Sequence, residues 1–136
     1  MPDPGTTASR VSPSDRRLWS ADVYRVSEQR FEELAGQALD SIPDSLARYM
    51  DNVAVVVEDR SEGHRLFGLY QGVPLTQRGN HYTGVAPDRI TLYREEICAV
   101  CSNEAELVAQ IRKTVVHEIA HHFGIGDARL SELGWA

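Results

Sequence analysis

Several features that would indicate other classes of protein are scarce or missing from this sequence. Its 136 residues include two cysteines and two methionines, and 20 acidic residues against 14 basic ones give a net charge of −6. No apolar run is long enough to cross a bilayer, and no charged segment precedes an apolar stretch as in a signal peptide. Without clustered positive charge, nucleic acid and anionic membranes are disfavoured as main partners. We therefore expect a cytoplasmic protein that acts on small molecules, peptides or proteins.

The beginning of the chain also has little to bury. Residues 1–17 are rich in proline, serine, threonine and glycine and almost free of apolar side chains, so we predict a disordered N-terminal tail. Residues 18–136 are long enough to form one domain with a modest hydrophobic core and without disulfides.

Cys98 and Cys101 form a lone CxxC, which offers only two metal ligands. We expect two small buried residues with free thiols, and a reversible disulfide is the alternative.

Apolar residues at helical spacing and polar capping residues predict the helices. Ser27 is a plausible N-cap for a helix with one apolar stripe, and Pro43 ends that helix. A short helical turn over residues 44–50 follows. Asn103 and the carboxylate of Glu106, three residues later, predict the start of a long helix near the C-terminus.

Three short segments between these helices have the composition of strands. Residues 53–57 (VAVVV) are β-branched and bounded by polar residues, which predicts a strand buried on both faces at the centre of a sheet. Residues 66–70 predict a second strand. Residues 71–88 are punctuated by glycine and proline, so we expect a long loop or ribbon at the rim of a cleft. Residues 90–93 alternate apolar and polar side chains, which is typical of a half-buried edge strand.

The most informative pattern is HExxHxxGxxD, which begins at His117 and ends at Asp127. On a helix, His117 and His121 lie four residues apart on one face, so both imidazoles can bind one metal ion. Glu118 is then close enough to act on a metal-bound water as a general base. A left-handed Gly124 would turn the chain back and bring the Asp127 carboxylate to the metal as a third ligand. Two histidines and an aspartate are a ligand set suited to zinc.

The residues after the second histidine also allow other interpretations. Asp127 could be only the N-cap of a short helix over residues 128–133. In that case Glu132, on the same short helix, would be the next candidate for the third ligand. His122 could contact the substrate or a metal ligand, but an exposed polar residue is the more ordinary interpretation.

The sequence resembles the small bacterial zincin-like metallopeptidases, minimal relatives of the metzincins. The resemblance covers about residues 27–136 and includes HEIAHHFGIGDARLSELGW, LFGLYQGVPLTQRG and DRITLYREEI. It implies an α+β minimal zincin-like fold, with a small mixed sheet, a backing helix and an active-site helix. His117, His121 and Asp127 match the metal ligands, and Glu118 matches the general base. The methionine turn of full metzincins is absent, because Met1 and Met50 both precede the motif.

The resemblance also suggests how a substrate would bind. Zincin-like enzymes commonly lay an extended substrate along an edge strand, which would be the strand near Ile90 or the ribbon before it. An ordinary edge strand fits the pattern equally well. Tyr70, Tyr82 and Tyr93 are the available candidates for stabilising an oxyanion.

These features together predict a zinc metallopeptidase. Zinc would lower the pKa of its bound water and polarise the scissile carbonyl, and Glu118 would transfer the proton to the leaving amine. A zinc-stabilised binding module with the same fold and little turnover is the alternative, favoured by the small size of the chain. The presence of Glu118 argues against that alternative, because a structural zinc site needs four protein ligands and no base.

Overall fold

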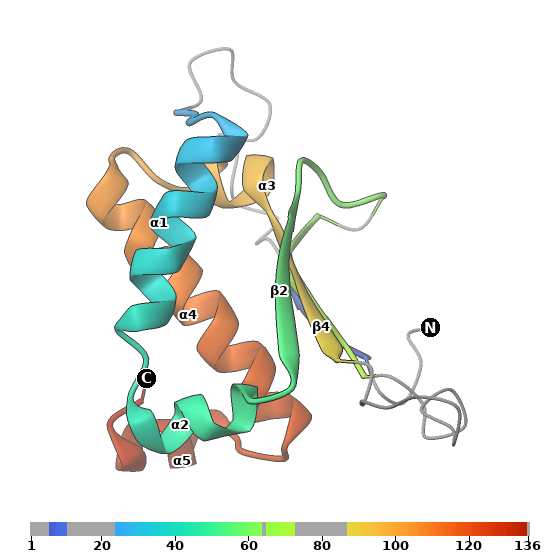
Figure 1. Ribbon diagram of the computed structural model, residues 1–136, viewed down its shortest axis with the longest axis vertical. Helices are drawn as coiled ribbons and strands as arrows, with labels where there is room; N and C mark the ends of the chain where they lie inside the picture. Colours follow the sequence, from blue (N-terminus) through green and yellow to red (C-terminus); the bar gives the residue numbers. More distant parts are fainter. Residues whose placement is uncertain (1–5, 11–23, 64, 73–86, 136) are drawn as a thin grey trace.

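The computed structural model describes residues 6–10, 24–63, 65–72 and 87–135. Within these ranges the protein is α+β, with a mixed sheet and several helices, as the sequence predicts (Figure 1). No helix of this part of the chain is both long enough and apolar enough to cross a lipid bilayer. In chain order, the elements are β1 (Thr6–Arg10), α1 (Glu28–Asp40), α2 (Asp44–Ala47), η2 (Arg48–Met50), β2 (Val53–Glu58), β3 (Leu66–Gln71), β4 (Asp88–Tyr93), α3 (Arg94–Ala99), α4 (Glu104–His122) and α5 (Asp127–Leu133).

Helices α1 and α4 begin at the capping residues that the sequence predicts. The Ser27 side chain accepts a hydrogen bond from the backbone N–H of Arg30 at the start of α1. At the start of α4, Asn103 accepts from the N–H of Glu106, whose carboxylate accepts in turn from the N–H of Ser102. These side chains satisfy amides that have no partner inside the helix, so both helices begin where expected.

The strand order corrects two of our expectations. The described strands lie in the order β1-β3-β4-β2, with β2 parallel to β4 and the other neighbours antiparallel. β2, expected at the centre and buried on both faces, is instead an edge strand with half-buried side chains. β4, expected at an edge, lies between β3 and β2, and its last four residues are buried. The burial of a strand depends on its neighbours in the sheet, and the composition of the strand does not identify those neighbours.

The strand β1 corrects a third expectation. Its residues pair antiparallel with β3, from Thr6 opposite Gln71 to Arg10 opposite Leu66. The prediction of disorder is therefore wrong for Thr6–Arg10. An edge strand is held by backbone hydrogen bonds and needs no continuous apolar pattern, so composition alone did not reveal it. The rest of the predicted tail and residues 73–86 of the predicted loop lie outside the described residues.

The long helix α4 is the centre of the hydrophobic core. It contacts β1, β3 and β4, while α1 packs against it and lies beside it in Figure 1. Cys98 and Cys101 are buried in this core with free thiols, as predicted. The fully buried core residues of these elements include Leu107, Ile111, Val115 and Ile119 of α4, Phe31, Leu34 and Ala38 of α1, and Ile90 and Leu92 of β4.

A glycine sets the distance between α4 and the sheet. A Cβ atom on Gly68 of β3 would lie 2.7 Å from the Cγ2 atom of Thr114 on α4 and 3.3 Å from the carbonyl oxygen of Thr91 on β4. Glycine inside a strand often marks such a close approach by another element. Gly68 therefore allows the middle of α4 to rest directly on β3.

Gly68→Ala should lower the free energy of unfolding by about 1–3 kcal/mol, because the new methyl group overpacks against Thr114. Gly36→Ala in α1 is the matched control: nothing lies within 4 Å of its added Cβ, so it should be neutral or stabilise by about 0.5–1 kcal/mol. Adding Thr114→Ser to Gly68→Ala removes the clashing methyl and should recover part of the loss. Urea denaturation measures all three, and unchanged stability in Gly68→Ala would show that α4 does not lie this close to the sheet.

Candidate metal centre

The chain reverses direction at the end of α4 through a glycine turn. Gly124 has a left-handed backbone with φ of +79°, as predicted. The N–H of Ile125 donates to the carbonyl of Ala120 at 2.7 Å, and the N–H of Gly124 donates to the carbonyl of His121 at 3.1 Å. This pair of hydrogen bonds is a Schellman motif, which satisfies the last carbonyls of the helix. The turn directs the next residues back towards α4.

This turn brings Asp127 to the second histidine of the motif. The Oδ1 atom of Asp127 lies 3.1 Å from the Nε2 atom of His121. Gly126 occupies the N-cap position of α5, where no side-chain cap bond forms. The interpretation of Asp127 as the N-cap of that helix is therefore wrong. Its carboxylate lies in the first turn of α5, where the helix dipole favours negative charge.

The two histidines lie next to one another on α4 but differ in environment. Their ring centroids are 5.6 Å apart. His121 is 42% exposed, whereas His117 is half-buried. Burial lowers the pKa of His117 below its ordinary value; the Asp127 carboxylate opposes this shift, and the positive charges of His121 and Lys113 add to it. A lowered pKa keeps His117 neutral, which is the form that binds metal ions.

Two of the three pair spacings among the proposed ligands can be compared with those around a tetrahedral zinc ion. Two donor atoms with zinc bonds of 2.0–2.1 Å lie about 3.3 Å apart, and the centroids of two zinc-bound imidazoles lie about 5.2 Å apart. The His121–Asp127 contact of 3.1 Å and the His117–His121 spacing of 5.6 Å are both close to these values. The donor chemistry also suits zinc. Among the described residues, however, no three His, Cys, Asp or Glu side chains are gathered into one metal-binding group.

Glu118 faces the sheet and is held there by the backbone of β3. Its side chain is 1% exposed, and its Oε1 atom accepts a hydrogen bond from the N–H of Tyr70 at 3.1 Å. Of the HExxH residues, Glu118 is thus the one that accepts a hydrogen bond from the backbone of the sheet. A buried carboxylate requires such a hydrogen bond, because removing it from water is otherwise costly.

Sequence reasoning missed the support that Tyr70 gives to this end of α4. The ring of His122 stacks on the ring of Tyr70 with centroids 3.9 Å apart and an interplanar angle of 19°. The Tyr70 hydroxyl donates to Oδ2 of Asp88 on β4 at 2.7 Å. His122 is thus half-buried rather than exposed as expected. Gly68, two residues before Tyr70, was the signal in the sequence that β3 closely approaches another element.

The structure describes two of the three candidates for oxyanion stabilisation. Tyr70 is fully buried and its hydroxyl already donates to Asp88. Tyr93 is buried at the end of β4. Tyr82 lies outside the described residues. The described part of the chain therefore gives no preference for Tyr70 or Tyr93 in this role.

Gly124→Ala should destabilise the fold by about 1–2 kcal/mol, because alanine is strained at a positive φ. It should also weaken zinc affinity, since this turn positions Asp127. Gly124→Asn should lose less, because asparagine tolerates the left-handed region. Gly126→Ser is the matched control: its backbone is extended, and serine is a good N-cap, so stability and zinc affinity should not fall. Thermal unfolding and zinc titration against a chelator measure both properties, and wild-type values in Gly124→Ala would contradict this role of the turn.

Comparison with known proteins identifies the family. Residues 50–135 match the family model described as zincin-like metallopeptidase. Among solved structures, a conserved hypothetical protein from T. thermophilus is 21% identical, with a TM-score of 0.46 over 81% of this chain and 100% of that one. No curated protein matches the sequence. The family match spans more than half of the chain and includes the whole HExxHxxGxxD motif, so the protein belongs to the zincin-like metallopeptidase family.

Proposed function

We propose that the protein is a zinc-dependent peptidase in which His117, His121 and Asp127 hold the zinc and Glu118 is the general base. Membership of the family supports zinc-dependent peptidase chemistry in general. The His121–Asp127 distance, the spacing of the two histidine rings and the lowered pKa of His117 support the assignment of the metal site.

The position of Glu118 is the observation that carries the proposal. A purely structural zinc site has four protein ligands and no need of a further carboxylate. Here a carboxylate that is 1% exposed lies between the two histidines in sequence, and a backbone N–H of the sheet fixes one of its oxygens. Such a fixed, nearly dry carboxylate is suited to proton transfer, because little rearrangement is needed during the reaction.

Each group of the proposed site has its own role in hydrolysis. When bound, zinc would polarise the scissile carbonyl and lower the pKa of the attacking water. Glu118 accepts the water proton at a carboxylate oxygen and later donates it to the nitrogen of the leaving amine. The N–H of Tyr70 keeps the carboxylate in one orientation during both transfers. The substrate is a peptide or protein.

The Glu118→Gln variant should bind zinc like the wild type and keep its stability, yet lose hydrolysis. A glutamine oxygen can still accept the hydrogen bond from Tyr70, but the amide cannot take up a proton. Glu118→Ala should lose hydrolysis and also about 1–3 kcal/mol of stability, because it leaves a buried N–H without its acceptor. Zinc titration, urea denaturation and a cleavage assay on unfolded proteins and peptide libraries separate these effects.

The pair of variants also distinguishes an enzyme from a zinc-stabilised binding module. Equal hydrolysis by Glu118→Gln and the wild type would remove Glu118 from the mechanism. A wild-type protein that binds zinc but cleaves nothing in the libraries would favour the binding module.

Asp127→Ala should weaken zinc binding by orders of magnitude, because a site with three protein ligands would keep only two. Asp127→His should retain much of the affinity, since histidine completes the same set of ligands in the related HExxHxxGxxH motif. Competition with a chelator of known affinity measures both. Full affinity in Asp127→Ala would contradict the assignment and make Glu132→Ala the next variant to test.

A further inference from the structure

A pocket of about 350 Å³ lies between α4 and α5, next to the proposed zinc ligands. His117 of α4 and Asp127 of α5 both line it. Its volume is at the lower end of the range of ligand sites, about 300–1,000 Å³, so it has room for one residue rather than a length of peptide. The pocket is therefore a candidate binding site for the substrate residue next to the scissile bond.

The walls of the pocket follow from helix spacing and from a second glycine turn. Arg112 and Val116, like Lys113 and His117, are four residues apart and so lie on one side of α4. Gly134 has a φ of +75°, and the N–H of Trp135 donates to the carbonyl of Leu130 at 3.0 Å. This Schellman motif folds the chain back at the end of α5. Both Leu130 and Trp135 are buried.

The lining combines apolar walls with two cations. Val116, Leu130 and Trp135 contribute the apolar side chains, and Arg112 and Lys113 contribute positive charge. Neither cation makes a side-chain hydrogen bond or an ion pair with any residue in the described part of the chain. By contrast, four other arginines are each paired with a carboxylate: Arg30, Arg60, Arg94 and Arg129. Within the described part of the chain, the charges of Arg112 and Lys113 are therefore not paired with a carboxylate.

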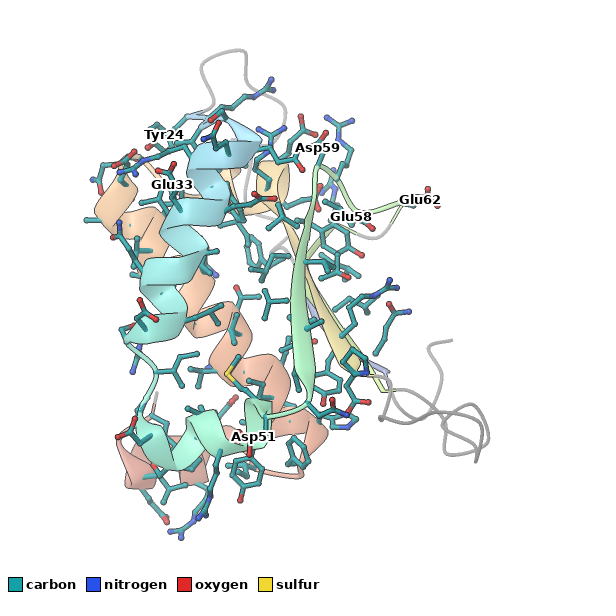
Figure 2. The ribbon with its side chains drawn as sticks, in the orientation of Figure 1. Tyr24, Glu33, Asp51, Glu58, Asp59 and Glu62 are labelled. Carbon is teal, nitrogen blue, oxygen red and sulfur yellow. The ribbon has the colours of Figure 1, made fainter. Side chains whose placement is uncertain are left out.

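Acidic residues lie at both ends of the molecule, and Asp127 is the carboxylate among the described residues that line the pocket. The protein as a whole has a net charge of −6. Figure 2 shows Glu58, Asp59 and Glu62 towards one end of the long axis and Asp51 towards the other end, where α5 lies (Figure 1). Glu132, on α5 itself, is paired with Arg129. A cation bound by Asp127 would offset the one carboxylate that lines the pocket.

We propose that this pocket binds the C-terminal residue of a peptide, with an apolar side chain against Val116, Leu130 and Trp135 and the terminal carboxylate at Arg112 and Lys113. An apolar side chain and a carboxylate occur on the same residue only at the C-terminus of a chain. An internal glutamate offers a carboxylate but little apolar surface. Arginine and lysine bind carboxylates through charge-assisted hydrogen bonds, which are stronger than neutral ones.

This assignment makes the enzyme a carboxypeptidase and rests on the proposed function. Because His117 and Asp127 line the pocket, a terminal residue bound there would have its preceding peptide bond beside two of the residues that would hold the zinc. Water then adds across that bond: its oxygen joins the acyl carbon, the C–N bond breaks, and its proton passes through Glu118 to the released amine. The products are one free apolar amino acid and a peptide shortened by one residue.

The test is calorimetric binding to the zinc-loaded, full-length Glu118→Gln protein. The probes are an N-acetylated peptide ending in leucine as the free acid, the same peptide as the C-terminal amide, and an amidated peptide with an internal glutamate. We expect the free acid to bind about tenfold or more tightly than either amide, which is the size of effect of a charge-assisted hydrogen bond. Equal affinity for the acid and its amide, or tighter binding of the internal glutamate, would overturn the proposal.

Variants then test whether the terminal carboxylate binds to Arg112 and Lys113 or directly to zinc. Arg112→Gln and Lys113→Gln should each reduce affinity for the free acid and leave affinity for the amide unchanged. Arg129→Gln is the matched control, since Arg129 is exposed on α5 and does not line the pocket, and it should leave both affinities unchanged. A preference for the acid that survives Arg112→Gln and Lys113→Gln together would overturn the role of these residues.

Hydrolysis by the wild type distinguishes failure of this inference from failure of the proposed function. Cleavage of the acid and the amide at equal rates would contradict the carboxypeptidase assignment and leave the peptidase intact. Selective binding of the acid without cleavage of any peptide would contradict the peptidase and leave the pocket assignment intact.

Discussion

The contact between α4 and β3 is the constraint on which the proposed metal centre depends. Glu118 accepts a hydrogen bond from the N–H of Tyr70, and one helical turn later the ring of His122 stacks on the Tyr70 ring. Gly68 makes the contact possible, because any side chain at this position would collide with Thr114 of the helix. Two attachments one turn apart fix both the position and the rotation of α4. That rotation determines the direction in which His117 and His121 point.

The rest of the site is built by two turns of the same kind, one at the end of each C-terminal helix. The first, at Gly124, brings Asp127 to His121, and the second, at Gly134, folds Trp135 back towards Leu130. Each depends on a glycine in the left-handed region and on hydrogen bonds to the last carbonyls of the helix. A short stretch of chain thus supplies both a proposed metal ligand and a wall of the neighbouring pocket.

The features that could be predicted from the sequence depend on residues close together in the chain. Caps such as Ser27 and Asn103, the left-handed Gly124 and the neighbouring positions of His117 and His121 all follow from local spacing. The order of the strands could not be predicted in this way, because β2 and β4 are distant in sequence and their composition does not identify their neighbours. β1 was missed because backbone hydrogen bonds hold it, and these do not depend on side-chain pattern. The support of Glu118 by Tyr70 was missed for the same reason, since its donor is a backbone N–H.

The most direct test of the metal centre is a crystal structure of the zinc-loaded protein, with anomalous diffraction recorded at the zinc absorption edge. We expect one zinc ion bound by His117, His121 and Asp127 at about 2.0–2.2 Å, with one position left for water. Glu118 should still accept the hydrogen bond from Tyr70. Zinc held by four protein side chains, or bound away from the end of α4, would contradict a catalytic centre at the HExxHxxGxxD motif.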